Sequence, residues 1–258
     1  MSARLLPALL AALALAPGAL RAEARPLQQI RDSGALMLCA HPNSLPFASK
    51  TGDKPGFQVE LARALAAQLG VPLGQEWIVT PSQVFRSNCD IILDVIGDQA
   101  QQSQSGLQVS KPYYRGGLVL VVPHGSKIHT FADLDGSTKV GVQYGSTTAM
   151  NLVQRHVAIS IFAFEDEMME ALANHEIAAA VVTRTIASYF ATTHPDQPVD
   201  IVDPDKTAPN MTWNIAIGMR RPDKPFRDAI DDALTRLQAD GTIARIYASY
   251  GVTISPPE

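Results

Sequence analysis

The sequence has no run of Lys and Arg residues, and its formal net charge is −4, with 21 basic against 25 acidic side chains. Proteins that bind nucleic acid through its phosphates need clustered basic residues, so this class is disfavoured. Cysteine is scarce, with two residues among 258. Two cysteines cannot form a Cys-rich zinc site or a framework of several disulfides. The 46% hydrophobic and 18% charged residues instead indicate a globular protein with a substantial core.

Motifs of catalysis and cofactor binding are missing too. The sequence contains no G-x-S-x-G, no G-x-G-x-x-G and no P-loop pattern, and none of its six histidines has H-x-H or H-E-x-x-H spacing. These histidines are predicted to be scattered surface residues rather than metal ligands. Because no nucleophile and general base occur together in a recognisable pattern, we expect a protein that is not an enzyme and that holds no metal or cofactor.

The first 24 residues are typical of a secretory signal peptide. A basic residue, Arg4, precedes an apolar stretch from Leu5 to about Leu15, and an A-x-A pattern occurs at Ala22–Ala24. A transmembrane anchor is the alternative, but about a dozen apolar residues are too few to span a hydrocarbon core of ~30 Å. No later apolar run approaches the required length, so we predict a soluble mature protein that is exported to the periplasm and cleaved near Ala24.

Two series of alternating strands and helices follow. Residues 35–40 form a short apolar run that predicts a buried strand, and residues 57–69 carry an apolar side chain at every fourth position, which predicts a helix. Strands near 77–80 and 90–96 complete a βαβ series with a parallel sheet. Residues 139–182 repeat the same plan, so the chain is predicted to contain two similar units.

The predicted fold is α/β with two lobes, each a mixed, mainly parallel sheet flanked by helices. One lobe comprises residues 25–119 and 219–258, the other comprises residues 120–218, and two crossover strands join them as a hinge. Small molecules commonly bind in clefts between domains and at the carboxyl ends of parallel strands. The cleft between the lobes is therefore the expected binding site.

Seven short segments, distributed over nearly the whole mature chain, carry a resemblance to the family-3 periplasmic solute-binding proteins of bacteria. They are Leu45–Phe47, Gly56-Phe57 with Glu60-Leu61, Cys89–Ile92, Ser110–Tyr114, Asp133–Gly136, Val140–Thr148 and Ala239–Tyr247. The resemblance implies the type II periplasmic binding fold, in which two lobes close about a hinge.

A narrower resemblance is to the binding-protein-like accessory proteins of PQQ-containing methanol and alcohol dehydrogenases. It is carried by Leu38–Phe47, Cys89-Asp90, Pro112–Arg115 and Tyr247–Val252. This branch implies a non-catalytic periplasmic protein that assists the maturation of such a dehydrogenase or contacts it directly. The dehydrogenase is then the expected partner.

Amino-acid-binding members of the family hold the ligand carboxylate with an Arg that precedes the Ser-x-Pro-Tyr motif, and hold its ammonium with an Asp after a strand of the second lobe. A planar guanidinium suits a carboxylate because it forms two parallel hydrogen bonds. Here residues 91–114 contain no Arg, residues 101–103 are Gln, Gln and Ser, and Thr183 followed by Arg184 stands at the Asp position. The comparison with these members disfavours a standard amino acid as the ligand.

The candidate residues of the ligand or partner cleft are Asn43, Phe47, Asp94, Tyr113, Tyr114, Tyr144, Ser146, Thr147, Thr183 and Arg184. The aromatic members could stack on a ligand or on a partner's segment, or could be core residues. Ser146 and Thr147 suit either an anion at a helix N-terminus or an ordinary N-cap. Asp94 is a candidate cleft carboxylate, whereas Asp90 is expected to cap the entry to its strand.

The favoured function from the sequence is the accessory role with a PQQ-dependent methanol or alcohol dehydrogenase. The alternative is the substrate-binding component of an ABC importer, with a permease as partner and a ligand that is a small solute other than a standard amino acid. A third class, a periplasmic dehydratase or lyase on the same fold, lacks a visible acid–base pair.

Cys39 and Cys89 are predicted to be unpaired. An exported protein with two cysteines favours a disulfide, but Cys39 lies late in the first strand and Cys89 lies just before the third strand, which is the expected parallel neighbour. Matched strand starts place the two residues four or five positions out of register, roughly 15 Å apart at ~3.3 Å per residue. A disulfide requires a Cα separation of about 4.4–6.8 Å.

Overall fold

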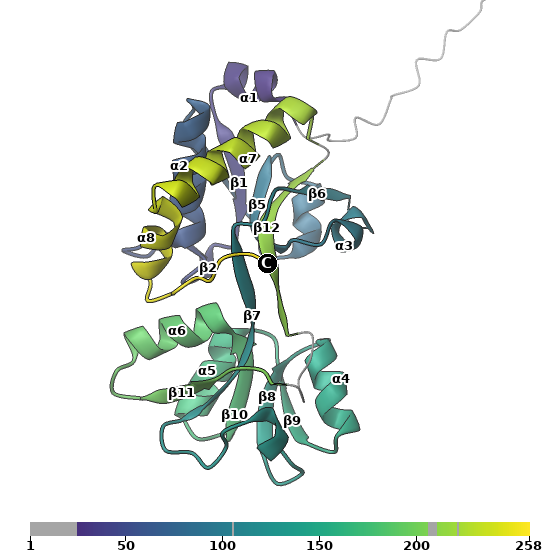
Figure 1. The fold of residues 1–258 in the computed structure, drawn as a ribbon, viewed down its shortest axis with the longest axis vertical. Coiled ribbons are helices and arrows are strands. Elements are labelled where there is room, and N and C mark those ends of the chain that lie inside the picture. Colours follow the sequence, from purple (N-terminus) through teal and green to yellow (C-terminus); the bar gives the residue numbers. More distant parts are fainter. Residues whose placement is uncertain (1–24, 105, 206–210, 221) are drawn as a thin grey trace, which may run out of the picture.

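A computed structural model describes residues 25–104, 106–205, 211–220 and 222–258 of the chain. The predicted signal peptide, residues 1–24, lies outside the described residues. Figure 1 shows two lobes along the long axis of the molecule, joined by the long strand β7 (Tyr114–Pro123). The predicted two-lobed α/β fold is therefore confirmed.

The first lobe combines the N-terminal βαβ series with the C-terminal helices. Its strands are β1 (Leu36–Ala40), β4 (Leu73–Trp77), β5 (Ile91–Ile96), β6 (Leu107–Val109) and β12 (Thr212–Arg220), with a separate pair β2 (Asn43–Ser44) and β3 (Ala48–Ser49). Its helices are α1 (Leu27–Ser33), α2 (Phe57–Leu69), α3 (Gln99–Gln104), α7 (Lys224–Ala239) and α8 (Thr242–Ala248), and Pro81–Phe85 form a 3₁₀ turn. Strand β1 lies between β4 and β5, parallel to both, and β12 runs antiparallel to β5.

The second lobe repeats the plan. Its strands are β8 (Lys139–Gln143), β9 (Ala158–Phe162), β10 (Ala179–Thr183) and β11 (Val199–Val202), its helices are α4 (Thr147–Gln154), α5 (Glu165–Ala173) and α6 (Arg184–Thr193), and Phe131–Asp133 form a 3₁₀ turn. Strand β8 is parallel to both β9 and β10. The carboxyl ends of these parallel strands therefore share one edge of the sheet.

Strand β7 is the hinge strand because it belongs to both sheets. Its residues 114–117 pair with β12 in the first lobe, and residues 118–121 pair with β10 in the second. Strand β12 pairs with β7 through residues 212–215 and with β5 and β6 through residues 215–220. The beginning of β12 thus runs beside the hinge strand, and the lobe boundaries after residues 119 and 218 stay predictions.

Each lobe has its own core. The first-lobe core gathers the apolar face of α2, which presents Phe57, Leu61, Leu65 and Leu69, together with β1, β5, α7 and α8. Helix α2 ends at Gly70, whose φ of 76° is a left-handed C-cap conformation that glycine adopts without strain. The second-lobe core forms two clusters, one on each face of its sheet, because a parallel sheet buries both faces.

Cys39 and Cys89 form a disulfide, so the prediction that they are unpaired is wrong. Their Cα atoms are 5.3 Å apart, and no cysteine in the described part of the chain is free. Strand β1 pairs Leu38 with Ile91 and Cys39 with Ile92. If the strand continued regularly before Ile91, Cys89 would lie three positions away from Ile92, the residue that pairs with Cys39. The strand begins only at Ile91, however, and the irregular residues before it bring Cys89 back toward β1.

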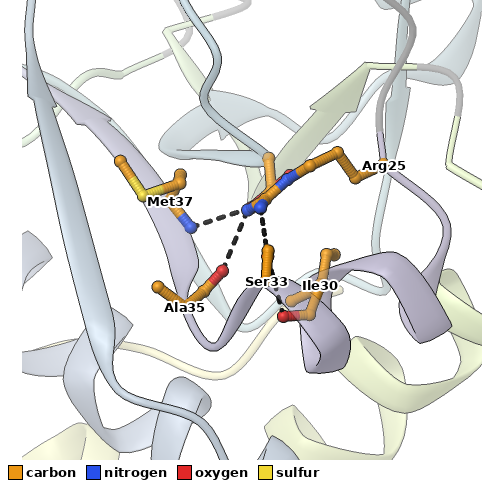
Figure 2. Close-up of polar contacts among 6 residues, drawn as sticks. Arg25, Ile30, Ser33, Ala35 and Met37 are labelled. Carbon is orange, nitrogen blue, oxygen red and sulfur yellow. Dashed lines mark hydrogen bonds and ion pairs between the residues drawn. The ribbon is translucent and has the colours of Figure 1, made fainter.

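Arg25 fixes the same irregular segment from the other side. Its guanidinium forms an ion pair with Asp90, which is 2% exposed, and also donates to the Ala35 carbonyl at 2.9 Å and to the Ser33 hydroxyl (Figure 2). The Asp90 carboxylate accepts the Met37 N–H at 2.8 Å as well. Asp90 thus joins the entry of β5 to β1, in agreement with the structural role expected for it.

Candidate functional site

The site lies in a cleft of about 450 Å³ between the lobes. The first lobe lines it with the segment that follows β1, and the second lobe lines it with residues at the end of β8 and at the beginning of α5 and α6. The lining residues are His41, Asn43, Ser44, Leu45, Phe47, Gln143, Phe164, Glu165, Asp166, Glu167 and Ile186. The position at the carboxyl ends of β1 and β8 is where open α/β sheets bind small ligands.

The second-lobe wall of the cleft is acidic. Glu165, Asp166 and Glu167 form the first turn of α5, where the partial positive charge of the helix N-terminus favours carboxylates. Glu165 is held in place by Thr183, whose N–H and hydroxyl donate to the two carboxylate oxygens at 2.9 and 2.7 Å. Burial raises the pKa of Glu165, and the two bonds from Thr183 oppose that rise.

Aromatic rings flank this acidic wall. Phe47 packs against the cores of both lobes, and its ring lies 5.1 Å from that of Phe57. Phe164 is 54% exposed at the mouth of the cleft, with the His41 ring 6.5 Å away. The cleft therefore offers carboxylates and apolar rings together, which is suited to a small cation with an apolar body.

Three of the predicted site residues belong to this cleft. Asn43 and Phe47 line it directly. Thr183 caps α6 by accepting the Ile186 N–H and contributes to the cleft through its bonds to Glu165.

Four predicted residues lie elsewhere. Tyr144 is 79% exposed after β8, and Ser146 is the N-cap of α4, with its hydroxyl accepting the Ala149 N–H. Thr147, the first residue of α4, is exposed and does not line the cleft. Arg184 pairs with Asp203 and lines a second cavity of about 600 Å³ beside the hinge, together with Arg115 and Glu258.

Tyr113 and Tyr114 do not flank the cleft, which corrects the expectation from the sequence. They are 2% and 5% exposed and belong to the first-lobe core. Their hydroxyls donate to one oxygen of Asp94, at 2.8 and 3.1 Å. The partly buried Asp94 carboxylate satisfies both hydroxyls, which allows the two rings to be buried.

Asp94 is the centre of a buried polar cluster rather than a free carboxylate of the cleft. Besides the hydroxyls of Tyr113 and Tyr114, it accepts the Tyr247 hydroxyl at 2.9 Å and the Gln58 side-chain amide at 2.8 Å. Burial raises the pKa of Asp94, while the four hydrogen bonds lower it. Its φ of 57° is a left-handed conformation that Asp tolerates better than most residues.

The sequence did not identify the residues that make the cleft acidic. None of Glu165–Glu167, Gln143 and Phe164 is among the predicted site residues, and His41 is predicted only as one of the scattered surface histidines. A usable signal was present, since three consecutive acidic residues follow a strand of the second βαβ unit, where side chains point toward the ligand edge of the sheet.

No cluster of His, Cys, Asp and Glu suited to a metal ion occurs in the part of the chain that the structure describes. Within the same residues, no helix combines the length and the apolar character needed to cross a bilayer.

Two lobes around a hinge, with a ligand-sized cleft between them, define a binding protein for small solutes. The chain belongs to the bacterial extracellular solute-binding proteins, family 3, whose model matches residues 36–253. Members of this family act outside the cytoplasmic membrane, in agreement with the predicted export.

The chain is similar to proteins that are named for amino-acid binding. It is 26% identical over 215 residues to the "Probable histidine-binding protein" of Neisseria gonorrhoeae, covering 80% of this chain and 78% of that protein. It is 24% identical over 234 residues to the L-cystine-binding protein TcyJ of Escherichia coli strain K12, covering 84% and 82%. An ancestral cationic amino acid solute-binding protein shares the fold, with a TM-score of 0.74 at 23% identity over 88% of this chain and 99% of that structure.

Proposed function

We propose that this protein is the substrate-binding component of an ABC importer and that its ligand is a small organic cation. The observation that carries the proposal is the acidic wall of the cleft, Glu165–Glu167, which faces His41 and Asn43 across the gap between the lobes. The described residues that line the cleft include no Lys or Arg. A cation entering this space meets carboxylates without a competing positive charge.

The arrangement of Glu165 supports recognition of an ammonium, guanidinium or imidazolium group. Its carboxylate is oriented by Thr183, so a cation can bind it without first ordering the side chain. Hydrogen bonds to charged groups contribute about 1.5–3 kcal/mol each, and partial burial strengthens them. The apolar part of the ligand would lie against Phe47 and Phe164.

The ligand is proposed to lack a carboxylate. Residues 91–114 contain no Arg, and the nearby Arg115 and Arg184 line the second cavity rather than the cleft. A free amino acid would therefore bring its carboxylate toward an acidic wall without a guanidinium to balance it. Amines related to the basic amino acids fit better than the amino acids themselves.

The second candidate is the accessory role with a PQQ dehydrogenase. It is favoured only by the short segments that resemble that branch, such as Leu38–Phe47 and Tyr247–Val252. The partner groove expected from Tyr113 and Tyr114 is not formed, because both rings are core residues. The relatives, named for histidine and cystine binding, support the importer role instead.

A deletion strain of the source organism separates the two roles. If the protein serves an importer, the strain loses uptake of a labelled amine such as agmatine or histamine and keeps full periplasmic PQQ-dehydrogenase activity. Loss of dehydrogenase activity with normal amine uptake would contradict the proposal and support the accessory role. Complementation with the wild-type gene controls for effects on neighbouring genes.

A further inference from the structure

Helix α6 packs against both lobes. Ile186, Ala187 and Phe190 belong to the second-lobe core, to which the helix is connected. Thr185, Tyr189 and Thr192 follow one another at helical spacing on another side of the helix. These three side chains contact the first lobe.

Each of the three contacts involves a different part of the first lobe. The Thr185 side chain lies against the Tyr114 hydroxyl. Tyr189 is half-buried and packs against the first-lobe core. Thr192 meets the turn after α8, since a Cβ on Gly251 would lie 2.0 Å from its hydroxyl oxygen.

The first-lobe side of the last contact is rigid. Tyr250, which precedes Gly251, is 1% exposed. Its hydroxyl accepts the Gly56 N–H at 2.9 Å and donates to Glu60 at 2.7 Å. Because Tyr250 holds the turn that contains Gly251, a side chain added at Gly251 must push α6 away rather than move that turn.

The contact of Thr192 lies at the end of α6 that is farther from the hinge strand β7. Figure 1 shows α6 extending away from β7 below α8, with its first residue, Arg184, next to the end of β10. Rotation of the lobes about β7 moves the far end of the helix, at Thr192, more than its beginning. A rotation that separates the lobes would pull Thr192 away from Gly251.

We propose that Tyr189, Thr192 and Gly251 form a latch that sets how much of the protein is closed, and through that population sets ligand affinity from outside the cleft. The observed affinity of a closing protein scales with the fraction of molecules in the binding-competent state. The link to affinity rests on the proposed function, whereas the effect on lobe closure does not depend on any ligand.

The test is Gly251→Ala compared with Gly70→Ala. Both glycines have nearly the same left-handed φ, 74° and 76°, so an Ala imposes the same backbone strain at each. Only at Gly251 does the new Cβ meet another lobe, because nothing lies within 4 Å at Gly70. Adding Thr192→Ala to Gly251→Ala removes the atom at 2.0 Å and leaves the Thr192 Cβ at 2.7 Å.

Small-angle X-ray scattering of the ligand-free protein measures closure directly. Gly251→Ala should increase the radius of gyration, Gly70→Ala should not, and the double variant Gly251→Ala/Thr192→Ala should return part of the way. Equal radii for the two single variants, with circular dichroism showing both folded, would overturn the latch. If Gly251→Ala does not fold, Tyr189→Ala decides, since it removes contact without adding a clash and should also increase the radius; an unchanged radius refutes the proposal.

Affinity for agmatine gives the second readout. Gly251→Ala should weaken binding at least tenfold relative to Gly70→Ala, although neither residue touches the cleft. A larger radius of gyration without any agmatine binding in the wild type would support the latch and contradict the proposed ligand, so the two failures are distinguishable.

Discussion

Replacing Asp94 tests the interpretation of the buried cluster. In Asp94→Ala, the hydroxyls of Tyr113, Tyr114 and Tyr247 lose a common acceptor inside the first lobe. A buried polar group left without a partner costs about 1–3 kcal/mol. An Ala at a φ of 57° adds about 1 kcal/mol. Part of this loss is offset because a buried carboxylate is removed, so we expect a destabilisation of roughly 3–6 kcal/mol.

Asp94→Asn is the matched control. Asn tolerates the left-handed backbone, and the two lone pairs of its side-chain oxygen can accept two of the three hydroxyls, while the Tyr247 hydroxyl can donate to that of Tyr113, 3.4 Å away. Gln58 must then turn its amide so that its oxygen accepts from the new NH₂ group, which its freely rotating terminus allows. The expected change in the free energy of unfolding is within about 1 kcal/mol.

Thermal unfolding followed by circular dichroism measures both variants. For a protein of this size, 1 kcal/mol shifts Tm by about 2–4 °C, so Asp94→Ala should lower Tm by roughly 6–24 °C while Asp94→Asn changes it little. Wild-type stability in Asp94→Ala, or equal losses in both variants, would refute the reasoning.

The pH dependence gives an independent check with a definite sign. Burial raises the pKa of Asp94 above its ordinary value of 3.8, so the folded state holds this proton more tightly than the unfolded state. The Asp94 contribution therefore favours the folded state below pH 3.8 and is lost as pH rises through the folded pKa. The stability of Asp94→Asn relative to wild type should increase over that window, and a flat difference would contradict the assigned pKa direction.

The remaining predictions concern the disulfide, Arg25 and Glu165. Thiol titration of unfolded, unreduced protein should find no free thiol, and Cys39→Ser/Cys89→Ser should lose about 4 kcal/mol, since the bridge closes a loop with a separation of 50 residues; one or two free thiols would contradict the pairing. Arg25→Ala should destabilise by roughly 3 kcal/mol in urea unfolding because Asp90 is left buried without its cation, and an unchanged midpoint would contradict this. Glu165→Gln should weaken agmatine binding at least tenfold in calorimetry while Glu170→Gln, on the same helix outside the cleft, does not. Wild-type affinity for agmatine should also fall as pH falls through the raised pKa of Glu165, because protonation removes the charge, and a pH-independent affinity would exclude Glu165 as the partner.

The sequence predicted the fold well because periodicity and strand–helix alternation carry it. The apolar positions of α2 and the runs that form β1 and β5 are local patterns, and they were sufficient to place a parallel sheet in each lobe. The apolar run of β12 does not show in the sequence which strands it pairs with, because that pairing depends on distant segments.

The errors at the site have a common physical origin. In the sequence, Tyr113 and Tyr114 look the same whether their hydroxyls face a ligand or a buried carboxylate. Only the positions of Asp94 and Tyr247 in the folded chain distinguish the two cases. The disulfide was missed because strand register was assumed from matched strand starts, whereas Cys89 lies in an irregular segment outside the strand. Local sequence does not encode such contacts between distant segments.

The central claim, that the cleft binds an organic cation without a carboxylate, is tested most directly by isothermal titration calorimetry with matched ligands. Agmatine is arginine without its carboxylate, and histamine is histidine without its carboxylate. We predict that each amine binds at least tenfold more tightly than its amino acid, a difference of about 1.4 kcal/mol or more. Tighter binding of arginine or histidine than of the corresponding amine would contradict the account and show that the cleft recognises a carboxylate.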